Sequence, residues 1–391
     1  ALHWITHSSE GHLNTNKSYM SQSIKFVSKE YDFFTTLNHR VNQYFKTKNI
    51  SRNANSAMVF KTIAMFTLYF GPYAVIVAGS FSSLYVFYAL SAIMGFGLAG
   101  IGMSVMHDAN HSAYSKKKWV NTLLGYSLNM VGGNAFNWKV QHNVLHHTFT
   151  NVDGTDEDIE PRGVLRFCPH TDWKPFHKFQ FIYAWFFYGL LSFIWIVFKD
   201  FERLTRYKRA GQIKKQKTTE LKEWSVLIFT KIAYYAYIIV IPMLVLPFAW
   251  WHVLIGFFVM HYIAGFILAV VFQLAHVVEG TEYPVPDETG NIYNTWAVHQ
   301  LHTTANFAQH NKLLSWYVGG LNYQVEHHLF SNICHVHYHK LSEIVKETSE
   351  EFGHPYKSKR RLRDAVASHF KVLKALGKKD ASPVLEAVFV P

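Results

Sequence analysis

The sequence reads LYVFYALSAIMGFGLAGIGMSVMHDANH from residue 84 to residue 111. Its first part, residues 84–106, is an apolar stretch close to the roughly 20 residues that cross a lipid bilayer as a helix. His107 and His111 follow directly. On a helix, residues four apart share one face, so both imidazoles can point at the same place. This stretch therefore predicts a membrane helix that ends in a pair of metal-ligating side chains.

Four further apolar stretches are also long enough to be membrane helices. They cover residues 58–79, 179–198, 225–247 and 251–275. The links that follow the first and the third of these are short and uncharged, so each is expected to join two spans in a tight hairpin. Aromatic residues make up 17% of the chain and gather at the ends of the stretches, as they do at membrane interfaces. The sequence therefore predicts an integral membrane protein.

The stretch 179–198 is expected to lie in the membrane interface or to re-enter. Lys and Arg residues precede it and follow it, and positive charge favours the cytoplasm on both flanks. Its apolar content alone is a signal for crossing, but a crossing would place one basic flank outside. The predicted fold is therefore all-α, with four transmembrane helices in two hairpins and a cytoplasmic helical cap.

Residues 23–340 are expected to form one integrated membrane domain. Residues 1–22 are polar and are expected to be a disordered extension, and residues 341–391 are expected to form a basic cytoplasmic tail. The formal net charge is +12, from 38 basic and 26 acidic residues. Because the basic residues flank the apolar stretches and form no nucleic-acid motif, membrane lipids are the expected partners and nucleic acid is not.

Three groups stand out among the 24 histidines: HDANH at residues 107–111, HNVLHH at 142–147 and QVEHH at 324–328. A closed zinc site needs four ligands, and these groups offer at least seven imidazoles, so two metal ions are implied. Imidazole suits iron, copper and zinc alike, and oxygen chemistry on an apolar substrate is what favours iron. With only two cysteines, the chain has no disulfide framework or zinc ribbon.

Several side chains near these groups are candidates for ligands or for hydrogen-bond partners of ligands. Asp108 and Glu326 are expected to accept hydrogen bonds from ligating imidazoles. The acidic residues Asp153, Asp156, Asp158 and Glu160 could orient ligands or meet a basic partner, but they are expected to form a solvated loop. His302 is a weaker candidate for an extra ligand. The other histidines are expected to bind no metal, with the last three on a cytoplasmic surface: His39, His252, His261, His354, His369, His335, His337 and His339.

The three groups resemble the histidine boxes of the membrane fatty acid desaturase family. The first group and QVEHH are similar to its front-end branch, in which Gln replaces the first His of the third box, and within that branch to bacterial linoleoyl-type acyl-CoA desaturases. The resemblance runs from about Ser23 to His339 and includes the segment from Trp296 to Phe307.

The resemblance implies two iron ions and a ligand set. The implied ligands are His107, His111, His142, His146, His147, His327 and His328, with His276 as the contributor from outside the boxes. Gln324 either ligates a metal or hydrogen-bonds a ligand. The second box is spaced H-x-x-x-H-H where H-x-x-H-H is commoner, although both spacings keep the imidazoles near one helical face.

The implied activity is the oxygen-dependent insertion of a cis double bond into a fatty acyl chain, carried by CoA or by a phospholipid. The sequence lacks the His-Pro-Gly-Gly motif of the haem domain that many front-end members carry, so the electrons are expected from a separate ferredoxin or cytochrome. A lipid hydroxylase with the same metal centre is the nearest alternative. A membrane metal transporter or a receptor with histidine-bound zinc is the alternative from another class.

Overall fold

Helices make up most of the part of the chain that the computed structural model describes, which is residues 24–28, 32–79, 81–160 and 163–381. The strands in this part are two residues long. β1 (Lys25–Phe26) pairs in parallel with β2 (Asn291–Ile292), and β3 (Asn306–Phe307) pairs in parallel with β4 (Ser358–Lys359). The predicted helical class is confirmed, while the extension expected at residues 1–22 lies outside the described residues.

All five apolar stretches are helical and are long and apolar enough to cross a membrane. The helices that contain them cover Ser56–Ala78, Leu84–Asn110, Pro175–Arg209, Glu220–Val245 and Trp250–His276. Many of their outward side chains are apolar; Phe60, Ile182 and Phe229, for example, are 67%, 62% and 72% exposed. Such surfaces are stable against lipid, so the chain is a membrane protein.

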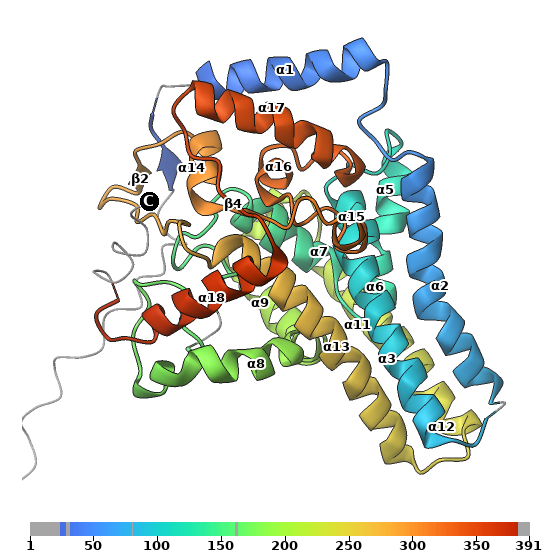
Figure 1. Cartoon of the computed structure of the whole chain (residues 1–391). Helices are drawn as coiled ribbons and strands as arrows, with labels where there is room; N and C mark the ends of the chain where they lie inside the picture. The colour runs from blue at the N-terminus through green and yellow to red at the C-terminus, as the bar shows by residue number, and fades with distance from the viewer. Residues whose placement is uncertain (1–23, 29–31, 80, 161–162, 382–391) are drawn as a thin grey trace, which may run out of the picture.

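Two helical hairpins pack side by side at the lower right of Figure 1. One consists of α2 (Ser56–Ala78) and α3 (Leu84–Gly100), and the other joins α12 (Ile241–Val245) to α13 (Trp250–His276). α3 contacts both α2 and α13. A Cβ atom at Gly97 would lie only 2.6 Å from the backbone nitrogen of Tyr69, so glycine is what permits the close approach of α2 and α3.

The stretch predicted to lie in the interface forms one long, bent helical segment. It comprises η4 (Pro175–Phe179), α8 (Gln180–Ile194), the π-helical turn η5 (Trp195–Lys199) and α9 (Asp200–Arg209). α8 packs against α13, and in Figure 1 it runs across the direction of α2 and α3. The second hairpin begins after it, with α10 (Gln212–Lys215), α11 (Glu220–Tyr235) and the π-helical turn η6 (Ala236–Val240).

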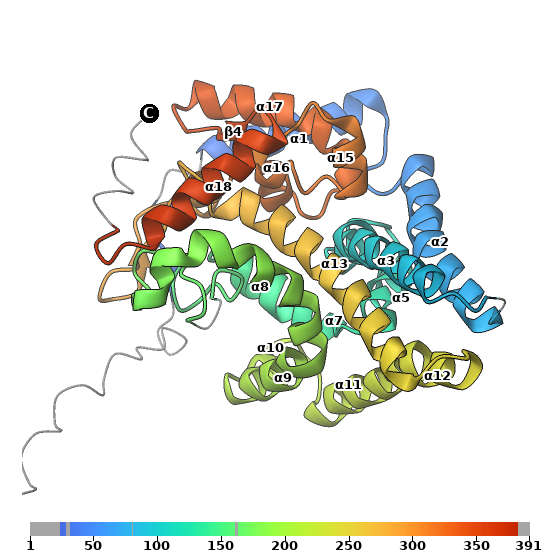
Figure 2. The ribbon, with the colours of Figure 1, turned by 60° about the horizontal axis from the view of Figure 1, so that its bottom comes forward.

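Shorter helices gather around the upper ends of α3 and α13 in Figures 1 and 2. They are α1 (Asp32–Lys48), α4 (Met106–Asn110), α5 (Lys118–Gly125), α6 (Ser127–Met130), α7 (Ala135–Trp138), α14 (Trp296–Thr303), α15 (Lys312–Tyr317), α16 (Gln324–Leu329) and η7 (His335–His337). The π-helical segments η2 (Ile101–Val105) and η3 (Lys139–His146) carry the chain into the first and second histidine groups. These elements carry or surround the three histidine groups.

The C-terminal part of the described chain packs onto the rest of the fold. α17 (Tyr338–Glu351) lies against α1, and α18 (Leu362–Leu376) lies against α8 and α13. Leu341 and Val345 of α17 share a buried core with residues of α1, and Leu373 and Leu376 of α18 share one with α8. The boundary expected at residue 340 therefore falls inside α17, and the residues up to 376 belong to the same folded unit.

Candidate metal centre

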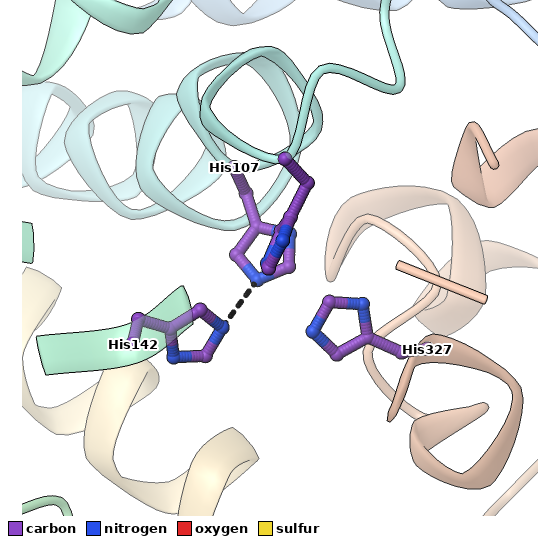
Figure 3. A group of neighbouring side chains, drawn as sticks. His107, His142 and His327 are labelled. Atoms are coloured by element: carbon purple, nitrogen blue, oxygen red, sulfur yellow. Dashed lines mark hydrogen bonds between the residues drawn. The ribbon is translucent and has the colours of Figure 1, made fainter. Parts of the chain in front are cut away.

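Four histidines from three separate parts of the chain form the first cluster. His107 lies on α4, His111 follows that helix, His142 lies on η3 and His327 lies on α16. One ring nitrogen of each lies within 4.8 Å of a nitrogen of every other member. Figure 3 shows the imidazoles of His107, His142 and His327 pointing toward one another, with the Nε2 atoms of His107 and His142 3.2 Å apart.

A second cluster of His146, His276 and His328 lies beside the first, again with nitrogens within 4.8 Å of one another. His276 reaches it from the last turn of α13, outside the three sequence groups. The Nε2 atom of Gln324 lies 2.9 Å from Nε2 of His276 and 3.3 Å from Nε2 of His328. Rotating the amide group by half a turn would exchange its nitrogen and its oxygen. The side chain can therefore ligate a metal through the oxygen or donate a hydrogen bond through the nitrogen.

His147 lies between the two clusters. Its Nε2 atom is 2.9 Å from Nε2 of His327 and 3.2 Å from Nε2 of His142. On its other side, its ring stacks on that of His328, with the ring centres 4.3 Å apart. Every histidine of the predicted ligand set therefore belongs to one connected group of imidazoles.

The spacing of the ring nitrogens fits metal binding better than hydrogen bonding. Nε2 of His142 lies 3.2 Å from the Nε2 atoms of both His107 and His147, although it carries at most one proton. Two nitrogens about 2.1 Å from one metal, at an angle between 90° and 109°, lie about 3.0–3.4 Å apart. Nε2 of His111 and Nε2 of His146 are buried without a hydrogen-bond partner among the described residues, as expected of atoms reserved for a metal.

Burial also sets the protonation of these imidazoles. It lowers the pKa of His142, His147, His327 and His328 well below the usual value, which leaves them in the neutral form that binds metals. His146 differs from them. Burial is again the largest influence and acts to lower its pKa, but the carboxylates of Asp156 and Asp158 together outweigh burial, so the pKa of His146 is raised.

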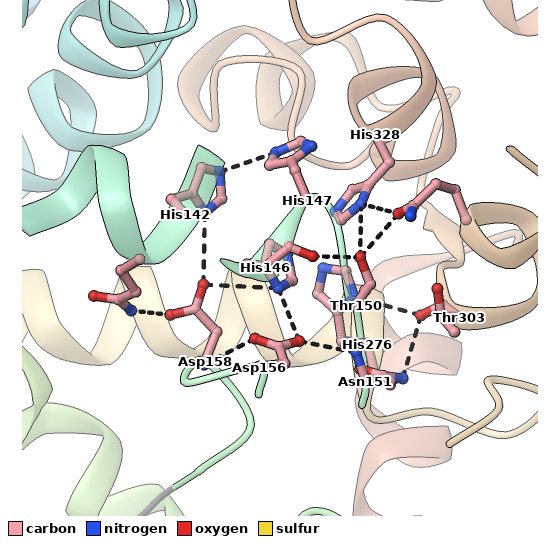
Figure 4. A network of polar contacts seen from close by, with 12 residues as sticks. His142, His146, His147, Thr150, Asn151, Asp156, Asp158, His276, Thr303 and His328 are labelled. Atoms are coloured by element: carbon pink, nitrogen blue, oxygen red, sulfur yellow. Dashed lines mark hydrogen bonds and ion pairs between the residues drawn. The ribbon is translucent and has the colours of Figure 1, made fainter. Parts of the chain in front are cut away.

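The outer nitrogens of the imidazoles bind oxygens that hold the rings in place (Figure 4). Nδ1 of His146 lies 2.9 Å from Oδ2 of Asp156, and Nδ1 of His328 lies 2.7 Å from Oε1 of Gln300. Nδ1 of His276 lies 3.4 Å from the carbonyl oxygen of Thr303. Such contacts fix the tautomer and the direction of a ligating ring.

The sequence-based choice of outer carboxylates was wrong. Oδ2 of Asp108 lies 2.8 Å from Nδ1 of His335, which belongs to neither cluster, and Glu326 accepts hydrogen bonds from Asn306 and Tyr356. The loop expected to be solvated instead buries Asp156, which is 1% exposed, against the second cluster. Asp108 and Glu326 point away from the two clusters although each is next to a predicted ligand in the sequence, whereas this loop folds back onto the second cluster.

Of the three histidines expected to form a surface patch after the third box, His339 is exposed, but the other two are not. His335 and His337 are buried, and Nε2 of His335 lies 2.6 Å from Nζ of Lys61 on α2. His302, the weaker ligand candidate, lies outside both clusters, with Nδ1 2.6 Å from Oε1 of Glu282.

A cavity of about 330 Å³ opens beside the clusters, within the range of small-molecule pockets. His107, His142 and Gln324 line it on the side of the metal centre. The rest of its wall is mostly apolar and comes from α3, α8, α13 and neighbouring loops, and includes Leu98, Met103, Leu191, Leu268 and Phe272. An apolar chain that entered this cavity would lie against these imidazoles.

The variant Asp156→Asn is expected to lower metal affinity or activity by about 10- to 100-fold, because it removes the charge that orients His146. Metal content and turnover of the purified protein measure the effect. Asp153→Asn, in the same loop, is the matched control, since Asp153 bonds to Thr171 and to neither cluster. Equal behaviour of the two variants would show that Asp156 has no part in positioning the ligand.

Comparisons with known proteins agree with this site. The sequence profile of the fatty acid desaturase family matches residues 82–360. The chain is 36% identical to the sn-1 linoleoyl-lipid 6-desaturase of Synechocystis sp. over 92% of its own length and 99% of that protein's. It is 33% identical to the protein of the same name from Arthrospira platensis (93% and 97%) and 35% identical to the acyl-lipid (8-3)-desaturase of Physcomitrium patens (88% and 72%).

Proposed function

Because the chain belongs to the fatty acid desaturase family, and is therefore an oxidoreductase that acts on fatty acyl chains, we propose that it is a front-end acyl desaturase with two irons. It would insert a cis double bond into an acyl chain carried by a lipid or by CoA. Oxygen and electrons from a separate ferredoxin or cytochrome are the other reactants. The observation that carries the proposal is that imidazoles of the metal centre form part of the wall of an apolar cavity.

In this proposal the first cluster and His147 hold one iron, and the second cluster and Gln324 hold the other. When bound, the iron pair supplies oxygen activation and the removal of two hydrogens from adjacent carbons. The protein's part is to hold the imidazoles in fixed positions, to keep water from the cavity and to place the acyl chain. The names of the relatives, which include 6-desaturases and a Delta(5) desaturase, support the front-end type.

Iron analysis of the purified protein and lipid analysis of cells that express it test this function. We expect about two irons per chain and a new cis double bond near the carboxyl end of an acyl chain. A single zinc per chain, or unchanged lipids, would contradict the proposal. The hydroxylase alternative predicts a hydroxyl group in place of the double bond, which lipid mass spectrometry distinguishes. Membership of the family argues against the transporter and receptor alternatives.

We further propose a topology of four spans, with α8 in the membrane interface and the metal centre on the cytoplasmic side. The ring centres of His146 and His276 are 4.7 Å apart, so an even number of crossings must separate them. The α11–α12 segment and α13 supply two crossings. A crossing by α8 would add a third, and this odd number would place His146 and His276 on opposite sides of the membrane. The basic flanks of α8 support the cytoplasmic side. The desaturase domain in this proposal begins near residue 23.

Labelling of introduced cysteines tests the topology, because the native Cys168 and Cys334 are both buried. Lys178 and Lys215 are exposed on the two sides of α8, and Ser82 is exposed in the first hairpin. We expect a membrane-impermeant reagent to label Lys178→Cys and Lys215→Cys from the cytoplasm and Ser82→Cys from the opposite side. Labelling of the two lysine positions from opposite sides would mean that α8 crosses.

A further inference from the structure

Gln273 places a polar group in the wall of the cavity beside the metal centre. It lies on α13, lines the cavity and is only 6% exposed. Its amide oxygen is buried without a hydrogen-bond partner among the described residues. An unpaired buried amide is unfavourable, so an atom of a ligand is the natural partner for it.

The part of α13 around Gln273 faces both the cavity and the metal centre. Ala269 and Phe272 line the cavity together with Gln273. The ring centre of Phe272 lies 5.0 Å from that of His146, a member of the second cluster. His276, the predicted ligand on this helix, is three residues further along, which is less than one helical turn. A group held by Gln273 would therefore lie close to the second cluster.

Two other glutamines line the same cavity, but their amides are already engaged. The Nε2 atom of Gln324 lies 2.9 Å from Nε2 of His276. Gln141 also has an unpaired buried oxygen, but its amide nitrogen donates to Asp158. That contact fixes the amide, so Gln141 offers a ligand only an acceptor. Within the described part of the chain, no hydrogen bond holds the side chain of Gln273 in one orientation.

The chemistry of an acyl substrate determines which end of the Gln273 amide it would meet. The carbonyl oxygen of an ester or a thioester accepts hydrogen bonds, and the acyl group has no donor. Because rotation exchanges the nitrogen and the oxygen of a carboxamide, Gln273 can present its nitrogen as the donor. Ligand pockets commonly use a few such polar groups in a mostly apolar wall to fix the orientation of the ligand.

The position of Gln273 along α13 suits a carbonyl near the reacting carbons. Three helical residues advance about 4.5 Å along the helix axis. Three bonds of an extended chain advance about 3.5 Å. A carbonyl held at Gln273 would thus place carbons only a few bonds away from it at the level of His276.

We propose that the amide nitrogen of Gln273 donates a hydrogen bond to the carbonyl oxygen of the acyl substrate. This contact fixes which carbons of the chain meet the metal centre, counted from the carbonyl, as front-end desaturation requires. The inference rests on the proposed function and deepens it. A lipid ester and a CoA thioester share the carbonyl, whereas an ether or a thioether lacks it.

Ligand binding by the metal-loaded protein in detergent tests the proposal without a need for turnover. Native mass spectrometry would compare three matched pairs with the same saturated chain. The pairs are the ester and ether forms of phosphatidylglycerol, the ester and ether forms of galactosyl diacylglycerol, and acyl-CoA with its thioether analogue. We expect the wild type to prefer the carbonyl form of at least one pair by about fivefold, which is the effect of one hydrogen bond. The pair that shows the preference identifies the carrier.

Gln273→Met removes the donor at similar volume. It should abolish the preference and leave binding of the ether or thioether form within about twofold of the wild type. The infrared band of a ¹³C-labelled carbonyl should lie at lower frequency in the wild-type complex than in the Gln273→Met complex, a difference that a merely structural role would not produce. Gln43→Met, on the exposed side of α1, is the control that should change neither readout.

Equal affinity of the wild type for both forms of every pair, or an equal loss of all six ligands in Gln273→Met, would overturn the proposal. If Gln273→Met does not fold, the wild-type comparison decides, together with the carbonyl frequency of the ligand bound to the wild type and free in detergent. Selective binding of the carbonyl form without double-bond formation in cells would contradict the proposed function alone. Double-bond formation by a wild type that lacks this selectivity would contradict the role of Gln273 alone.

Discussion

Replacing His327 with alanine is expected to abolish double-bond formation and to lower the iron content from about two to about one per chain. His327 is the member of the first cluster that α16 supplies. Its Nε2 atom lies 2.9 Å from that of His147, and its ring centre lies 4.5 Å from that of His107. Under the proposed ligand set, one iron would lose a ligand and its link to α16 in this variant. We expect the loss of activity to exceed the loss of about 10- to 100-fold that is typical when a residue hydrogen-bonded to a metal ligand is replaced.

His302→Ala is the matched control for this experiment. It also removes a histidine side chain, but His302 contacts Glu282, and its side chain is 27% exposed. Its iron content and activity are expected to stay within about twofold of the wild type, since exposed pairs of this kind contribute little. Lipid analysis of cells and iron analysis of the purified variants give the two readouts. Normal desaturation by His327→Ala would show that the third box does not hold the metal.

The histidine groups and the apolar stretches are predictable from the sequence because they depend on local chemistry. An uncharged stretch such as residues 84–106 has few stable environments other than a bilayer or a buried core. Clustered imidazoles have few uses other than metal binding. His276 stands alone in the sequence, and only the resemblance to a family identified it before the structure placed it beside His146 and His328.

The partners of the ligands were not predictable in the same way. Asp108 is the neighbour of His107 in sequence, but successive helical residues point about 100° apart, and its carboxylate meets His335 instead. Asp156 reaches His146 because the chain after the second box turns back on itself, and Gln300 reaches His328 from a separate helix. These contacts depend on tertiary packing, which no local spacing reveals.

The π-helical segments are a second feature that local patterns missed. The amide of His147 donates to the carbonyl oxygen of His142, five residues earlier, at 2.9 Å. This hydrogen bond belongs to a π-helix, which is rare and tends to occur at functional sites. It explains how the H-x-x-x-H-H spacing brings His142 and His147 to one place, with their Nε2 atoms 3.2 Å apart.

The largest expected effect on stability comes from Lys231, a buried cation on α11. Its Nζ atom donates to Oδ2 of Asp200 at 2.7 Å and to the carbonyl oxygens of Gly132 and Ile196 at 2.6 and 2.7 Å. Asp200 is fully buried and also accepts a hydrogen bond from the indole of Trp195. Trp195 and Ile196 line the cavity beside the metal centre, so the Lys231 side chain joins the second hairpin to the wall of this cavity.

Lys231→Met is expected to lower the free energy of unfolding in detergent by about 3–5 kcal/mol, because it leaves the Asp200 carboxylate buried without its counter-ion. Lys208→Met is the control: Lys208 pairs with Glu220 at 2.5 Å, but both side chains are about half exposed, at 51% and 47%, so a change below about 1 kcal/mol is expected. The double variant Lys231→Met/Asp200→Asn should recover much of the loss, since it removes the stranded charge. If the double variant is as unstable as Lys231→Met, the lost hydrogen bonds to Gly132 and Ile196 cause the instability, and the unpaired carboxylate does not.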